Sequence, residues 1–168
     1  MNRLFLAISC LCLISCSSKT VIEPWEGYTY AFDKDGRVPV LIKHEKHRYM
    51  LHTNIRHLRN LLYHTPEGKI DKIIEENPLW QFLIYCRCEV EDSTMLMRLL
   101  KKYDCDFPVI IDPEGNFIER NKLGEYSEIG FICDKENRCY GVSSIGTSQS
   151  FFDQEFRKAK SEINDTRF

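Results

Sequence analysis

The stretch LWQFLIYCRCEV, residues 79–90, constrains the fold more than any other part of the chain. Its apolar residues run continuously instead of alternating, which is typical of a strand buried on both faces, as in a parallel sheet. Parallel strands need long crossover connections, which are usually helices. The sequence therefore predicts an α/β fold in which helices cover a sheet that contains this strand.

The flanking segments supply the other strands and the helices. Strands are expected at Val38–Ile42, Arg48–Thr53, Phe107–Ile111, Ile129–Cys133 and Cys139–Val142, the last two as an antiparallel hairpin around DKENR. Helical apolar stripes run over residues 55–62, 70–74, 96–103 and 152–163. Residues 104–123 read as a strand, a turn and a second strand. The pattern predicts a mixed sheet flanked by helices.

Composition excludes several classes of protein. A chain of 168 residues that is 43% hydrophobic is long and apolar enough for one folded domain, and it is too apolar for disorder. A net charge of −2 argues against a nucleic-acid binder. His44 and His47 have metal-ligand spacing, but they lie in a charged connection without nearby acidic or cysteine ligands. We therefore expect neither a metal nor a cofactor.

The N-terminus has the features of a targeting segment. Arg3 precedes an apolar run that is too short to span a bilayer and that ends in Leu13-Ile14-Ser15-Cys16. This end resembles the bacterial lipobox. The resemblance implies a lipoprotein signal peptide over residues 1–15, lipidation of Cys16, and a lipidated tether over 16–37. The alternative is an ordinary secretory signal. The expected location is the cell envelope, with a lipid anchor in the outer membrane facing the periplasm.

Three motifs after this tether resemble the thioredoxin-like superfamily, and more closely its redoxin-type lipoproteins. They are Phe107-Pro108-Val109 with Asp112, Asn121-Lys122-Leu123, and Phe131-Ile132-Cys133-Asp134 with Asn137. The resemblance implies a thioredoxin-like domain over residues 38–168.

The chain departs from that superfamily where its chemistry should be. The resemblance places a C-x-x-C pair where the Arg48–Thr53 strand enters a helix, but the chain has His52-Thr53-Asn54-Ile55 there and no C-x-x-C anywhere. It also places a proline before the third core strand, where the chain has Glu128-Ile129-Gly130. Because thiol exchange needs an accessible thiolate at the helix N-terminus, this position has no nucleophile.

Five cysteines remain beyond Cys16, and each has two interpretations. Cys86 and Cys88 lie on one face of a strand near its C-terminal end, so they are either a redox pair or two buried small residues. Cys133 and Cys139 flank the hairpin, so they form a disulfide or pack as thiols. Cys105 is expected to be a free thiol.

These observations favour a membrane-anchored thioredoxin-fold lipoprotein without classical disulfide oxidoreductase activity. It would act as a binding or accessory module for an envelope protein and contact the lipid bilayer through acylated Cys16. The alternative is a divergent thiol–disulfide oxidoreductase that uses Cys86 and Cys88. The sequence defines no ligand pocket.

Overall fold

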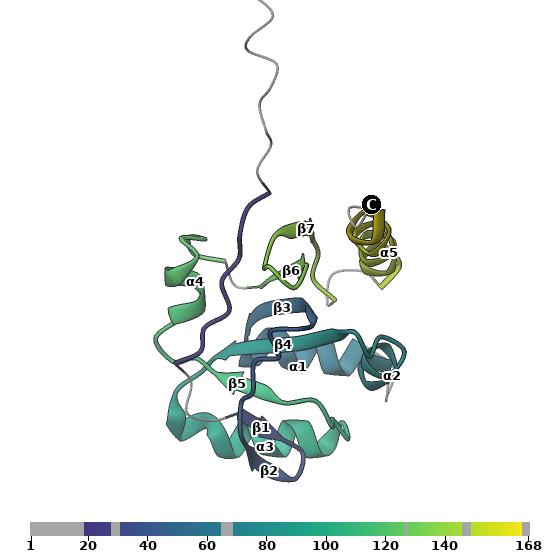
Figure 1. The fold of residues 1–168 in the computed structure, drawn as a ribbon. Coiled ribbons are helices and arrows are strands. Elements are labelled where there is room, and N and C mark those ends of the chain that lie inside the picture. The colour runs from purple at the N-terminus through teal and green to yellow at the C-terminus, as the bar shows by residue number, and fades with distance from the viewer. Residues whose placement is uncertain (1–18, 28–30, 65–68, 127, 146–148, 166–168) are drawn as a thin grey trace, which may run out of the picture.

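The computed structural model describes residues 19–27, 31–64, 69–126, 128–145 and 149–165 (Figure 1). The predicted signal peptide over 1–15 and the predicted lipidation site Cys16 lie outside the described residues. Seven strands form one sheet in the order β2-β1-β5-β4-β3-β6-β7. The strands are β1 (Ala31–Asp33), β2 (Gly36–Val38), β3 (His47–Asn54), β4 (Trp80–Arg87), β5 (Val109–Ile111), β6 (Ile129–Cys133) and β7 (Cys139–Val142).

The centre of the sheet is parallel. β4 pairs in parallel with β3 along its whole length and with β5 from Ile84 onward. β6, β7 and the β1–β2 hairpin add antiparallel strands at the two sides. The side chains of residues 82–86 in β4 are all buried, since both faces of this strand are covered. The expectation of a doubly covered parallel strand is confirmed.

Helices cover the two faces unequally. One face carries the longer helices, which are α1 (Ile55–His64), α2 (Lys69–Glu75), α3 (Ser93–Lys102) and α5 (Gln149–Asp165), with the short 3₁₀ turn η1 (Val90–Asp92) leading into α3. Among the described residues, the other face is covered by α4 (Asn116–Arg120), by Ile22 and Trp25, and by Val38, Val40 and Ile42. In Figure 1 the sheet separates α4 from α5. The mixed sheet flanked by helices is therefore the architecture that the sequence predicts.

Three local expectations differ from the structure. Residues 39–46 contain no strand, because β2 ends at Val38 and Pro39 has no N–H to continue a ladder. The second strand expected within 104–123 is instead the helix α4. Residues 31–37, assigned by sequence to the tether, form most of the β1–β2 hairpin, and β1 pairs with β5, so the sheet begins before residue 38.

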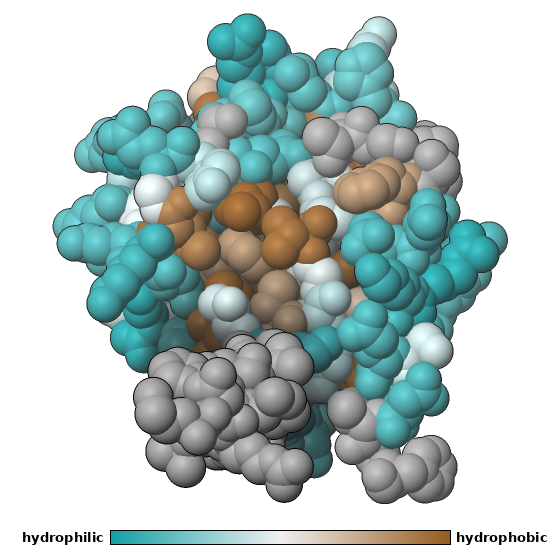
Figure 2. Space-filling view, turned by 90° about the horizontal axis from the view of Figure 1, so that it is seen from above, coloured by the Kyte–Doolittle hydropathy of each residue, from teal (hydrophilic) through white to brown (hydrophobic). Residues whose placement is uncertain are grey.

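The surface at the β7 edge is apolar at its centre. Figure 2 looks down on this edge and shows brown apolar groups surrounded by hydrophilic ones. Val142 on β7 and Val21, which bridges to Arg138, are each about half exposed. Among the described residues, no helix has the length and apolarity that a membrane span requires.

Candidate functional site

The C-terminal ends of β3, β4 and β5 meet at one edge of the sheet, where ligands of open α/β folds usually bind. β3 ends at Asn54 and α1 begins at Ile55, so His52-Thr53-Asn54-Ile55 forms a strand-to-helix junction as expected. Thr53 lies opposite Cys86 in the β3–β4 ladder. Asp112 follows directly after β5. These ends form the candidate site.

Polar side chains fill the space around the start of α1. Asn54 caps the helix, with its Oδ1 accepting the backbone N–H of His57 at 2.9 Å. The Nδ1 of His57 lies 3.7 Å from the Glu128 carboxylate, and Ser144 donates a hydrogen bond to the same carboxylate. Glu128 is the residue directly before β6. The sequence pointed to the position of Glu128 but not to the roles of His57 and Ser144, because only the fold brings these residues together.

A second polar group lies on the opposite face of the same edge. His52 is almost fully buried, and no hydrogen-bond partner reaches its Nδ1 within the described part of the chain. Its ring stacks at 6.5 Å on Phe117 of α4. Burial lowers the pKa of His52, the nearby Asp112 carboxylate opposes this shift, and Arg87 adds to it. Burial therefore favours the neutral form of His52 over its imidazolium form.

This buried neutral histidine should make the stability of the fold depend on pH. As pH falls below the ordinary histidine pKa of about 6.5, the unfolded chain takes up a proton that folded His52 does not. Stability should therefore fall by up to about 1.4 kcal/mol per pH unit from this group, until pH reaches the lowered folded pKa. Urea unfolding between about pH 7.5 and 5.5 measures the slope.

The variant His52→Gln should have a shallower slope than the wild type. His44→Gln is the matched control, since the side chain of His44 is 76% exposed. If His52→Gln and the wild type lose stability in parallel on acidification, the assignment is wrong.

The structure brings Cys86 and Cys88 together at the C-terminal end of β4, and both belong to the same buried apolar cluster. Both are buried thiols. A hydrogen bond from Cys86 to Cys88 raises the pKa of Cys86, which burial raises further, and lowers the pKa of Cys88. The pair has the contact that a redox pair needs, and it has the burial that packed structural thiols show.

The hairpin cysteines are also neighbours. Cys133 and Cys139 are register partners across the β6–β7 ladder, next to an irregularity in that ladder. Both are thiols in this structure, and a hydrogen bond from Cys133 lowers the pKa of Cys139 to about 7. The disulfide between them stays a prediction. Cys105 is a buried thiol whose pKa is raised by burial to about 12.

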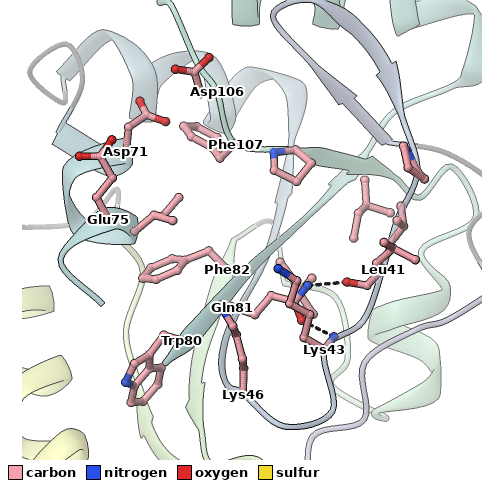
Figure 3. A pocket seen from close by; sticks show the side chains of 16 residues that line it. Leu41, Lys43, Lys46, Asp71, Glu75, Trp80, Gln81, Phe82, Asp106 and Phe107 are labelled. Carbon is pink, nitrogen blue, oxygen red and sulfur yellow. Dashed lines mark hydrogen bonds between the residues drawn. The ribbon is translucent and has the colours of Figure 1, made fainter. Parts of the chain in front are cut away.

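A cavity of about 420 Å³ lies at the opposite edge, at the N-terminal ends of β4 and β5 (Figure 3). β5 pairs with β4 from Ile84 to Cys86, and the part of β4 before Ile84 borders this cavity. The Gln81 side chain accepts from the Lys43 N–H and donates to the Leu41 carbonyl, which fixes the segment on one wall.

The charges of this cavity have both signs. Figure 3 shows carboxylates of Asp71, Glu75 and Asp106 on one side and lysines on the other. Asp106 already pairs with Lys34 at 2.8 Å, and burial raises the pKa of Asp71. The cavity therefore favours neither anionic nor cationic ligands.

The histidines with metal-ligand spacing lie in different surroundings. His47 is buried and its ring lies 5.2 Å from that of Trp80, while His44 is exposed and lies 3.8 Å from Glu26. Within the described ranges, no three His, Cys, Asp or Glu side chains gather as a metal site would require.

Neither a protein-family model nor a curated protein matches the chain in sequence. Solved structures do match it. One, from Chlorobium tepidum and provisionally named thiol:disulfide interchange protein DsbE, has a TM-score of 0.60 at 13% identity and covers 84% of this chain and 96% of its own. The mitochondrial 2-Cys peroxiredoxin of Plasmodium falciparum has a TM-score of 0.59 at 15% identity, over 89% and 96%.

A third match is a secreted Mycobacterium tuberculosis disulfide oxidoreductase homologous to E. coli DsbE, with a TM-score of 0.52 at 11% identity. It covers 76% of this chain and 93% of its own. At such identities the likeness shows the fold alone. The chain has a thioredoxin-like fold, and its structural neighbours are thioredoxin-like and DsbE-type redoxin folds.

Proposed function

We propose that this protein is a binding or accessory module of the bacterial cell envelope, built on a thioredoxin-like fold and without classical dithiol exchange. The observation that supports it most is the junction between β3 and α1. A thiolate there would attack a disulfide, but the chain places Thr53 and Asn54 at this point, and Asn54 uses its side chain to cap the helix.

The contacts around the junction support the same proposal. Glu128 belongs to the segment Glu128-Ile129-Gly130, where the resemblance places a proline, and its carboxylate binds Ser144 and lies beside His57. These side chains satisfy one another, and a carboxylate near an attacking sulfur would disfavour the thiolate. These contacts therefore favour a fixed set of polar side chains at this site over thiol–disulfide exchange.

The anchor is the second part of the proposal. The lipobox-like Leu13-Ile14-Ser15-Cys16 supports lipidation of Cys16 and a tether to the outer membrane on its periplasmic side. A diacylated cysteine holds a protein on a bilayer far more firmly than a single acyl chain.

A second candidate function is a divergent thiol–disulfide oxidoreductase. The direct contact between Cys86 and Cys88, and the lowered pKa of Cys88, favour it. Its weakness is access, because both side chains are buried in the core. A binding role needs only exposed side chains, whereas thiol exchange needs access to these buried sulfur atoms, so we place binding first.

The full chain should reduce insulin no faster than dithiothreitol does alone, since no exposed nucleophile stands at the helix N-terminus. Turbidity of the insulin B chain measures the rate. A catalytic rate that disappears in the Cys86→Ala, Cys88→Ala double variant would establish the second candidate instead.

The anchor is tested by labelling bacterial cells that express the chain with radioactive palmitate. The wild-type chain should take up the label and the Cys16→Ser variant should not. Equal labelling of the two would remove the anchor from the proposal.

A further inference from the structure

A groove of about 490 Å³ runs between α1 and α3. Its floor is apolar and comes from both helices: Ile55, Met95 and Leu99. Its rim is cationic and also comes from both helices: Arg56, Arg59, Arg98 and Lys102. The four cations are exposed, and Met95 is about half exposed, so the groove is open to a partner.

The charge of this surface differs from that of the whole chain. The protein has 25 acidic residues and a net charge of −2, yet neither α1 nor α3 contains any Asp or Glu. In the part of the chain that the structure describes, none of the four rim cations takes part in an ion pair. Four like charges repel one another around an apolar floor, and an anionic occupant would relieve this repulsion.

The spacing of these residues is regular. On α3, Met95 and Leu99 are one helical turn apart, and so are Arg98 and Lys102. On α1, Arg56 and Arg59 form the facing row. An apolar stripe therefore lies between two rows of cations.

The shape and the charges together select the occupant. A bilayer surface is flat and would leave the concave floor unfilled, and a nucleic-acid backbone would leave Met95 and Leu99 without apolar contact. A helix with one apolar ridge fits a groove between two helices, because its side chains enter the floor. Carboxylates on both sides of that ridge would meet the two cationic rows.

We infer that the groove between α1 and α3 binds an acidic amphipathic helix of another protein. This names the partner class of the proposed binding role, and it rests on that role. The groove itself does not depend on whether the cysteines are redox-active, so the insulin assay and the binding assay can fail separately.

The test uses the full chain and a synthetic helical peptide of about 16 residues, with leucines one turn apart and glutamates on both sides of them. Two matched peptides carry lysine for glutamate or serine for leucine. Fluorescence anisotropy should show saturable binding of the first peptide alone at or below about 100 μM. Added salt should weaken it, since the rim charges are exposed.

The variant Arg56→Glu, Arg98→Glu should bind at least about tenfold more weakly, and Met95→Gln should also weaken binding. The control Lys135→Glu, Lys158→Glu has the same change in net charge outside the groove and should bind as wild type does. The inference is overturned if the acidic peptide does not saturate, if the serine peptide binds equally well, or if the two charge variants behave alike. It is also overturned if the groove variants instead abolish binding to phosphatidylglycerol vesicles or self-association of the chain.

Discussion

Replacing Phe117 with alanine should lower the free energy of unfolding by about 3–5 kcal/mol, which is the usual cost of removing a buried phenylalanine ring. Phe117 is fully buried, and its ring stacks on Tyr85 with centroids 4.4 Å apart and an interplanar angle of 13°. It also faces Phe131 at 6.3 Å. Of the helices that the structure describes, α4 is the only one that packs on this face of the sheet, so no second helix there can close the resulting cavity.

Chemical denaturation of the full chain measures this loss. The control is Phe151→Ala on α5, since Phe151 is about half exposed and should lose less than about 1 kcal/mol. Phe117→Leu keeps part of the volume and should lie between the two, which keeps the comparison usable if the alanine variant does not fold. Equal losses for Phe117→Ala and Phe151→Ala would contradict the packing described for α4.

The helix α4 shows why some elements escape sequence analysis. It has five residues, too few for an apolar period of 3.6 to appear. It begins where it does because the buried Asp112 carboxylate accepts the backbone N–H groups of Asn116 at 2.8 Å and Phe117 at 3.1 Å. A capping interaction of this kind depends on where β5 ends, which the sequence pattern did not fix.

The central strand was predictable for the opposite reason. An unbroken apolar run fits a strand covered on both faces and few other structures, so β4 and its crossover helices followed from the order of apolar residues along the chain. The hairpin of β6 and β7 was predictable from its turn, and its cysteines are register partners. Short-range signals of this kind depend on residues close together in the chain.

The sequence alone predicted only part of the candidate site. The residues His52-Thr53-Asn54-Ile55 at the junction between β3 and α1 can be read directly from the chain, and it is the resemblance that places a cysteine pair there. The contacts of Glu128 with His57 and Ser144 cannot be read in this way, since three separate segments supply them. The same holds for the groove: each helix is basic in sequence, but only the fold sets α1 beside α3.

Gly130 of β6 should tolerate no side chain, and Gly130→Ala should destabilise the protein by about 3 kcal/mol. A Cβ at this position would come closer than 3.0 Å to both the backbone carbonyl of Ser143 and the hydroxyl of Tyr49. These two atoms cannot move freely. The Ser143 N–H donates to the Gly130 carbonyl at 2.9 Å, and the buried Tyr49 hydroxyl donates to the Ser143 carbonyl at 3.0 Å.

If the added Cβ of Gly130→Ala pushes the Ser143 backbone away, the shift should reach the candidate site. Ser144, which binds Glu128, directly follows Ser143. Gly141→Ala is the matched control on β7: its nearest obstacle is the terminal methyl of Ile132 at 3.2 Å, which can rotate away. A double-mutant cycle with Tyr49→Phe separates the two clashes. Removing the hydroxyl relieves one of them, so Gly130→Ala should cost less in the Tyr49→Phe background than in wild type. An unchanged cost would assign the whole effect to the Ser143 carbonyl, and a Gly130→Ala variant as stable as Gly141→Ala would contradict the close approach of β6 to this segment.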